Sequence, residues 1–173
     1  MCSPAEGQTF VIDPEFAFYG PMGFDTGAFI ANMILSYVSQ PGHKNGSDYP
    51  DWVLDQVIEF WTTFSQEFLK LWDDSSEHSG FKYHRELIGE SDSATQKSYM
   101  QQLLMDTLGF AGMKMLRRIV GIAHVEDLDS IEDADLRATC ERRGLEIAKE
   151  LIKNSLKYDS MEATIKMVKE KSS

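Results

Sequence analysis

Cysteine is scarce in this chain, and long hydrophobic runs are missing. The 173 residues contain two cysteines, Cys2 and Cys140, which show no pairing pattern and no metal-ligand spacing. No stretch approaches the roughly 18 consecutive apolar residues of a membrane-spanning helix, and no basic segment with an apolar core opens the chain. The sequence therefore predicts reduced thiols and a cytoplasmic protein with no membrane partner.

Positive charge is also in short supply. Lys and Arg total 17 against 28 Asp and Glu, which gives a formal charge of −11. This balance argues against a general nucleic-acid-binding surface and requires that any phosphate ligand be met by local positive charge. The length suits one globular domain that buries about 70% of its unfolded surface.

β-Strand patterns are almost absent. A single β-branched and aromatic run, TFVID at residues 9–13, reads as a strand, and Pro14 prevents its continuation as a central strand. A lone strand cannot satisfy its backbone hydrogen bonds, so a partner is needed. We expect that partner to lie outside this chain.

Helical periodicity fills most of the remaining sequence, so the predicted fold class is mainly α. Asp25 is a candidate N-cap for the first helix, and Ser130 opens a capping-box pattern, SIED. The polar residues 74–94 are predicted to be mobile or only partly helical. Helices are expected over residues 26–39, 95–122 and 130–157. A further helix is expected from Asp48 and Pro50 to about residue 74, and a last one after Ser160.

Two carboxylates flank a proline directly after the predicted strand. Asp13 and Glu15 are two residues apart, so they point to one side in extended geometry, and Pro14 stiffens the segment between them. Oxygen ligands on one face suit a hard cation such as Mg²⁺ together with phosphates and water. The alternative is an exposed acidic turn, the usual state of charged loops.

Two adjacent arginines interrupt an otherwise apolar helix pattern. Arg117 and Arg118 diverge by about 100° on a helix, so one can face a cleft while the other points to a groove or solvent. Guanidinium groups commonly bind phosphate and transferring phosphoryl groups, whereas the alternative is a snorkelling pair. His124 is assigned no catalytic role, and Arg142 and Arg143 are expected to form solvated ion pairs.

These segments resemble a known enzyme family. VIDPEFAFYGPMGFD with its following helix, and KMLRRIVGIAHVED with SIED and CERR, are similar to the C-terminal region of 5-methylthioribose kinases from about residue 10 to 148. The resemblance implies the C-terminal lobe of a protein-kinase-like fold, in the choline-kinase and aminoglycoside-phosphotransferase branch, with a remnant strand. It also implies transfer of the ATP γ-phosphate to the 1-hydroxyl of 5-methylthioribose in methionine salvage.

The same resemblance assigns roles to particular residues. The family's Asp-x-Glu metal site corresponds to Asp13, Pro14 and Glu15, which would bind Mg²⁺ and ATP. The family's paired arginines, which approach the sugar and the phosphoryl group, correspond to Arg117 and Arg118 as catalytic and substrate-binding residues. A homodimer is also expected from the family.

The sequence departs from the family in one respect. A His-Gly-Asp catalytic loop and an N-terminal lobe, expected before the Asp-x-Glu strand, are not found, and MCSPAEGQT stands in that place. We therefore expect residues 1–24 to be a remnant of the catalytic segment and residues 25–173 a helical lobe. Such a chain would arise from a truncated gene model, a split gene or an alternative start, and alone would be inactive. The alternative is a non-catalytic helical interaction module, a degenerate relative of the kinases.

Overall fold

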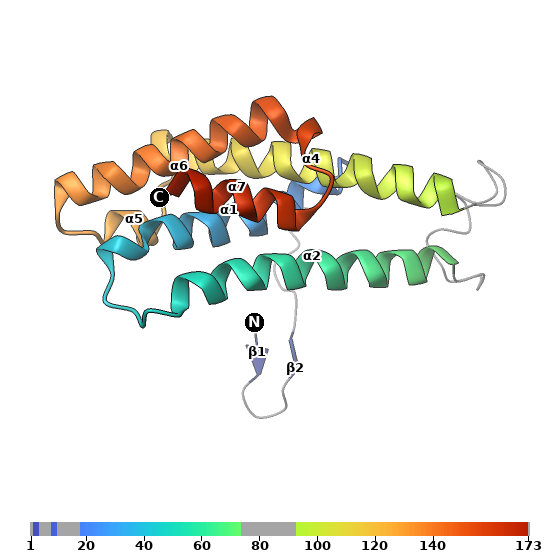
Figure 1. Cartoon of the computed structure of the whole chain (residues 1–173), viewed down its shortest axis with the longest axis horizontal. Coiled ribbons are helices and arrows are strands. Elements are labelled where there is room, and N and C mark those ends of the chain that lie inside the picture. Colours follow the sequence, from blue (N-terminus) through green and yellow to red (C-terminus); the bar gives the residue numbers. More distant parts are fainter. Residues whose placement is uncertain (1, 4–7, 10–17, 74–92, 173) are drawn as a thin grey trace.

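The computed structural model describes residues 2–3, 8–9, 18–73 and 93–172. The predictions for Asp13, Pro14 and Glu15, and those for residues 74–92, lie outside this part of the chain. The elements, shown in Figure 1, are β1 (Cys2–Ser3), β2 (Gln8–Thr9), α1 (Gly23–Ser39), η2 (Gln40–Gly42), α2 (Tyr49–Asp73), α4 (Ser93–Val120), α5 (Glu126–Asp129), α6 (Ala134–Asn154), η3 (Ser155–Lys157) and α7 (Met161–Ser172).

The mainly α prediction is confirmed, but one expectation about the strand is wrong. Thr9, the first residue of the predicted strand, belongs to β2, which pairs antiparallel with β1 of the same chain. The other four residues of that prediction are outside the described part. A partner for the described end of the strand thus exists within the chain, because Cys2 pairs with Thr9 and Ser3 with Gln8.

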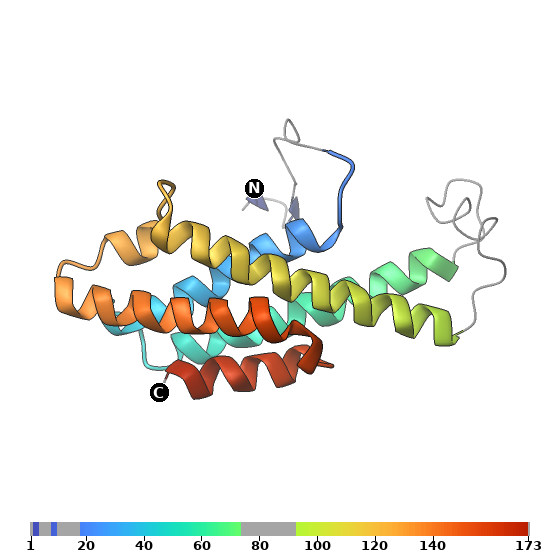
Figure 2. The same ribbon diagram turned by 90° about the horizontal axis from the view of Figure 1, so that it is seen from above.

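Helix α1 is the centre of the bundle. It contacts α2, α4, α5 and α6, and Figures 1 and 2 show the long helices lying side by side along the long axis of the molecule. Most of its residues are apolar or small and nine of its seventeen are buried, while a narrow stripe with Asp25 and Asn32 stays exposed, which explains its central position. None of the helices in the described ranges is both long and apolar enough to cross a membrane.

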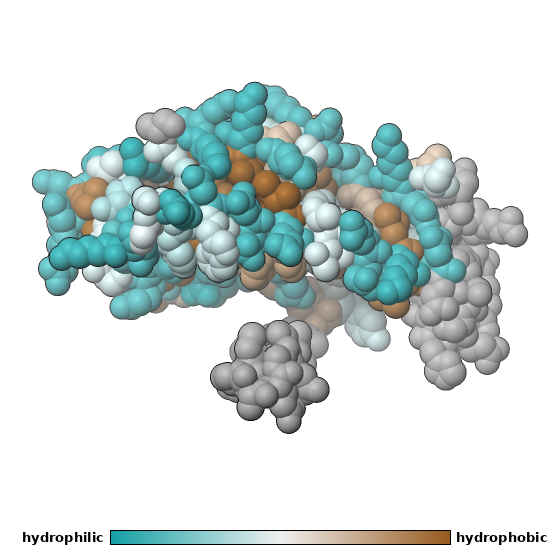
Figure 3. All heavy atoms as spheres, turned by 60° about the horizontal axis from the view of Figure 1, so that its bottom comes forward, coloured by the Kyte–Doolittle hydropathy of each residue, from teal (hydrophilic) through white to brown (hydrophobic). Residues whose placement is uncertain are grey.

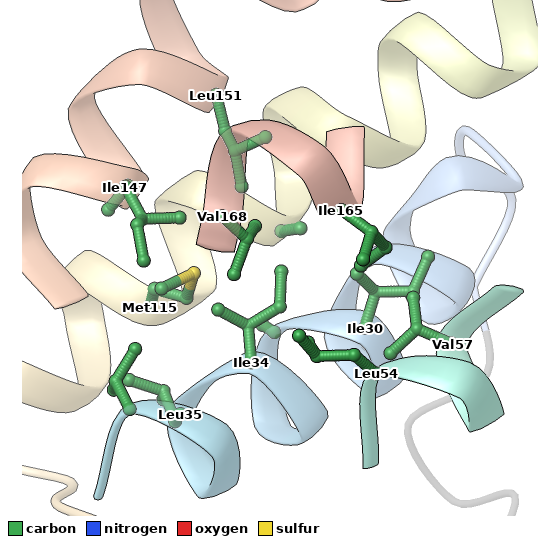
Figure 4. Close-up of a cluster of buried hydrophobic side chains, with 14 of the residues drawn as sticks. Ile30, Ile34, Leu35, Leu54, Val57, Met115, Ile147, Leu151, Ile165 and Val168 are labelled. Carbon is green, nitrogen blue, oxygen red and sulfur yellow. The ribbon is translucent and has the colours of Figure 1, made fainter. Parts of the chain in front are cut away.

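The core is built from all five long helices. Figure 4 shows buried aliphatic side chains of α1 facing those of its neighbours, with Met115 of α4 among them. Each of these residues is at most 4% exposed, so their burial supplies the main stabilising free energy of the bundle. The residues labelled in Figure 4 are Ile30, Ile34, Leu35, Leu54, Val57, Met115, Ile147, Leu151, Ile165 and Val168. Figure 3 shows one outer face of the molecule, on which hydrophilic side chains predominate around a smaller hydrophobic area.

Glycines bring α1 and α4 into close contact. A Cβ on Gly23 would lie 2.7 Å from the backbone N of Thr107, and one on Gly27 would lie 2.6 Å from the Thr107 carbonyl oxygen. Between these glycines, the Oγ1 of Thr26 forms a buried 2.8 Å hydrogen bond with the Oγ1 of Thr107. The two backbones therefore approach more closely than any residue with a side chain would permit.

Three small residues in the middle of α4, Gly109, Ala111 and Gly112, have separate roles. A Cβ on Gly112 would lie 2.7 Å from the Ala148 carbonyl oxygen, so Gly112 allows α6 to approach α4. Ala111 is fully buried in the core. By contrast, a Cβ on Gly109 would meet nothing within 4 Å.

Several helix ends differ from their prediction. Asp25 lies in the first turn of α1, and the N-cap position is Met22, which has no side-chain cap. The cap of α6 is Asp133, whose Oδ1 accepts hydrogen bonds from the backbone N–H groups of Asp135 and Leu136 at 3.0 and 3.1 Å. Ser130 instead donates to the Glu126 carbonyl at the end of α5, because a short extra helix occupies this stretch.

Helix α2 begins as predicted around Pro50 and runs to Asp73. Trp52 and Leu71, two large apolar residues of this helix, are 51% and 52% exposed, whereas Leu54 and Trp72 are buried. Each of these two exposed residues is followed in sequence by a buried residue. Because apolar residues occupy adjacent positions, the sequence pattern alone does not show which of the two is buried. Packing against α1 and α7 determines the buried face of α2.

A cluster of polar side chains links the C-terminal part of α6 to Tyr158 and to the last turn of α7. The Tyr158 hydroxyl donates to Glu150 Oε1 at 2.9 Å, and the Asn154 amide donates to the same oxygen at 3.0 Å. Lys171 Nζ lies 3.8 Å from the other oxygen of Glu150. These bonds lower the pKa of Glu150, and burial together with the Glu150 bond raises the pKa of Tyr158 to about 12.

The α1–α4 contact can be tested with two helical glycines. Gly27→Ala is expected to lower the free energy of unfolding by about 1–2 kcal/mol, because overpacking against the α4 backbone outweighs the gain in helix propensity. Gly109→Ala, the matched control, should raise it by up to about 1 kcal/mol, since only the propensity changes. Urea denaturation of the three proteins measures both values. Equal effects of the two substitutions would show that α1 and α4 are not in close contact at Gly27.

The Tyr158–Glu150 hydrogen bond can be tested by its pH dependence. Tyr158→Phe should lower the free energy of unfolding by about 1 kcal/mol at neutral pH. A raised tyrosine pKa stabilises the fold below the ordinary value of 10.0 and loses this effect as pH rises through about 12. The difference between the two proteins in urea denaturation should therefore shrink between pH 10 and 12. It should also shrink below pH 4.5, as the lowered pKa of Glu150 is passed. A difference that does not vary with pH would contradict the assignment.

Candidate functional site

The candidate site is a basic cluster on the C-terminal half of α4. Lys114 precedes Arg117 by three residues and Arg118 by four, and side chains at these spacings are neighbours on a helix surface. The two arginines occupy the last turn of α4, where positive charge is favoured by the exposed backbone carbonyls. The sequence thus concentrates three cations in a chain with a formal charge of −11.

The two arginines point in different ways, as expected for adjacent helical positions. Arg118 is half-buried, and its Nη1 donates to the Ala123 carbonyl at 3.2 Å, which ties the turn after α4 to the helix. Arg117 is exposed. Its carbonyl accepts the Gly121 N–H at 3.0 Å, and a Cβ on Gly121 would collide with that oxygen. Arg117 therefore presents a guanidinium to solvent from a fixed backbone.

An aromatic ladder positions Lys114 and the start of α1. The Lys114 Nζ lies 4.1 Å from the ring centroid of Phe24, a favourable cation–π distance. The Phe24 ring makes edge-to-face contacts with Phe18 and Phe110, with centroids 5.3 and 5.6 Å apart. This ladder brings the segment that enters α1 against the same side of α4 as the basic cluster.

The pKa of Lys114 reflects its burial and the repulsion between the positive charges of the basic cluster. Burial lowers the pKa of Lys114, and the charges of Arg117 and Arg118 lower it further, while Asp25 acts in the opposite direction. The three cations are thus close enough to repel one another. An anion placed among them would relieve this repulsion, which is the electrostatic condition for a phosphate or phosphoryl site.

The predicted metal ligands are not placed by the structure. Asp13, Pro14 and Glu15 are outside the described residues, so their fit to Mg²⁺ stays a prediction. Within the described ranges, no three His, Cys, Asp or Glu side chains gather closely enough to hold a metal ion.

The other candidate side chains have separate surroundings. His124 is exposed, with its Nδ1 4.0 Å from Asp129 Oδ1. The expected ion pairs of Arg142 and Arg143 are wrong, because neither arginine has an acidic partner among the described residues. The nearby Glu141 pairs with Arg137 instead. Arg142 is exposed, and Arg143 is half-buried near the middle of α6.

Sequence reasoning missed Lys114 and its aromatic support. The signal was available, because a lysine one turn before two arginines predicts a shared helix face. The part played by Phe24 was not readable, since it depends on α1 running beside α4, which brings residues more than 80 positions apart into contact.

Comparisons with known proteins identify clear relatives. The chain is 48% identical over 163 residues to methylthioribose kinase 2 of Oryza sativa subsp. japonica, covering 91% of this chain and 38% of that protein. It is 41% identical to the methylthioribose kinase of Escherichia coli O45:K1, covering 94% of this chain and 40% of that protein. A Bacillus cereus methylthioribose kinase is 37% identical, covering 95% and 37%. The matches fall in the C-terminal part of these proteins, and the chain spans about two fifths of their length. No family model matches the chain.

The different placement of the two arginines gives a stability test. Arg118→Ala should lower the free energy of unfolding by about 1 kcal/mol, because it removes a half-buried hydrogen bond from a charged donor. Arg117→Ala should change it by less than about 0.5 kcal/mol, as for exposed positions generally. Chemical denaturation of both variants measures the difference. A larger loss for Arg117→Ala than for Arg118→Ala would overturn the assigned orientations.

Proposed function

Because this chain is a homologue of the methylthioribose kinases and matches their C-terminal part, we propose that it is the C-terminal portion of an ATP-dependent kinase. The proposed reaction is phosphorylation of the 1-hydroxyl of 5-methylthioribose in methionine salvage. The observation that carries the proposal is 48% identity to a named methylthioribose kinase across 91% of the chain. The basic cluster on α4 supports it, since phosphoryl transfer needs local positive charge.

In this proposal Arg117 and Arg118 are the catalytic and substrate-binding cations. Arg117 is supported by its exposure and by its guanidinium, which can donate two parallel hydrogen bonds to a phosphoryl group. Arg118 uses one donor on Ala123, which leaves further N–H groups for a sugar hydroxyl or phosphate oxygen. Lys114 adds a third positive charge to the cluster.

Asp13, Pro14 and Glu15 are the proposed Mg²⁺ and ATP segment. When bound, Mg²⁺ would neutralise the phosphate charge of ATP. Glu15 precedes Phe18 by three residues, so covalent geometry limits their separation to about 10 Å. Phe18 packs on Phe24, which packs on Lys114. This short covalent link to Phe18 supports the proposal that Glu15 acts on the side of α4 that carries the cations.

The proposed partner is an N-terminal lobe, on the same or a separate chain. The relatives are more than twice as long as the region that this chain matches, and phosphoryl transfer requires several groups positioned together. In this view residues 1–24 supply the metal segment and residues 25–173 form the helical lobe. The alternative is a non-catalytic interaction module, which the continuous buried core of α1, α2, α4, α6 and α7 favours.

Reconstitution tests the proposal. The chain would be joined to the N-terminal portion that precedes the matched region in rice methylthioribose kinase 2, and ATP-dependent phosphorylation of 5-methylthioribose would be measured. The joined protein should be active, and Arg117→Ala or Asp13→Asn should each reduce kcat/KM on the order of a hundredfold, as for groups that stabilise transition-state charge.

Arg142→Ala is the matched control for removing one exposed arginine, and it should keep full activity. A well-folded joined protein without activity would favour the interaction module. Full activity in Arg117→Ala or Asp13→Asn would show that the site has been assigned to the wrong residues.

A further inference from the structure

A second arginine-lined site lies at the far end of the bundle from the start of α1. A cavity of about 300 Å³ opens where the turn between α1 and α2, the helix α6 and the end of α7 meet. In Figure 1 this is the end at which the C-terminus and the α1–α2 turn lie. We propose that this cavity binds a small organic monocarboxylate, with Arg143 as the residue that recognises the carboxylate.

The walls of the cavity are largely apolar. Val38 and the ring of Tyr37 come from the last turns of α1, while Pro41 and Pro50 close the cavity from η2 and the first turn of α2. Two prolines fix the backbone at both ends of the turn. A cavity of this size with apolar walls and few polar groups is typical of small-molecule sites.

Arg143 is the one charged side chain among the described residues that line the cavity. Arg143 is half-buried and, within the described ranges, makes no hydrogen bond or ion pair. Burying a guanidinium without a partner is costly, so an anion in the cavity would satisfy it. The guanidinium is also near the buried Cys140 thiol, whose pKa is raised by burial and lowered in part by Arg143.

A preformed amide pair borders Arg143. The Gln40 side chain is 9% exposed, donates to the Ser36 carbonyl at 2.7 Å and accepts from the Asn45 amide at 2.8 Å. Asn45 is thereby held in place, with its second N–H free to donate. The amides are fixed before any ligand arrives, which lowers the ordering cost of binding.

The single lining cation argues for one negative charge. A guanidinium and a carboxylate match in a planar, bidentate geometry. A dianion would leave one charge uncompensated in a chain with a formal charge of −11. The apolar walls call for a compact hydrocarbon body on the carboxylate. The proposed carboxylate site is separate from the basic cluster on α4 and does not depend on the proposed kinase activity.

The experiment uses benzoate as the probe and benzamide as its neutral match. The ¹⁵N-labelled full chain is titrated with each, and amide shifts in two-dimensional NMR spectra are followed. Benzoate should shift the amides of Gly46 and Ser47 with a dissociation constant on the order of 1 mM or below. Benzamide should bind at least tenfold more weakly.

Arg143→Gln should weaken benzoate binding at least tenfold, whereas Arg142→Gln, its exposed neighbour on α6, should bind as the unchanged chain does. The spectra themselves report whether each variant is folded, and Arg143→Lys should restore part of the affinity because the charge returns without the planar fork. Equal binding of benzoate and benzamide, shifts confined to the Arg117 region, or unchanged affinity in Arg143→Gln would each overturn the proposal. So would the absence of shifts at Gly46 and Ser47 at saturating benzoate.

Discussion

The close contact between α1 and α4 is the constraint on which the rest of the structure depends. Gly23 and Gly27 let the two backbones touch, and the buried Thr26–Thr107 hydrogen bond fixes their register. A hydrogen bond between hydroxyls inside a core is costly to misalign, since a displaced hydroxyl would be buried without a partner. One sliding position of α1 along α4 is therefore strongly preferred. The contacts of α1 with α2, α5 and α6 depend on that position.

The candidate site follows from this register. With Gly23 beside Thr107, the next residue, Phe24, falls beside Phe110 and under Lys114. The segment that enters α1 is thereby held on the basic side of α4. Arg118 then fixes the turn that follows the helix through Ala123. The same packing that stabilises the bundle thus presents Arg117 beside the entry of the chain, which is the arrangement that the proposed phosphoryl transfer requires.

The two pairs of adjacent arginines are similar in sequence but have different surroundings in the fold. Arg117 and Arg118 follow each other on α4, and Arg142 and Arg143 follow each other on α6, and each pair has one exposed and one half-buried member. On α4 the half-buried arginine is satisfied by a backbone carbonyl. On α6 the half-buried Arg143 faces a cavity instead. The sequence interpretation of the second pair as solvated ion pairs was wrong, because Glu141 pairs with Arg137 and, among the described residues, neither Arg142 nor Arg143 has an acidic partner.

The sequence by itself determined the number and type of the long helices, because apolar spacing reports burial on one face of a helix wherever that face lies. It also determined the family relationship, whereas the roles of Arg117 and Arg118 stay a prediction. Only the tertiary structure decided the burial of Trp72 in place of Leu71, the position of Phe24 under Lys114, and the cavity beside Arg143. These features depend on contacts between residues distant in sequence, and a local pattern carries no information about which distant residue will fill the space beside it.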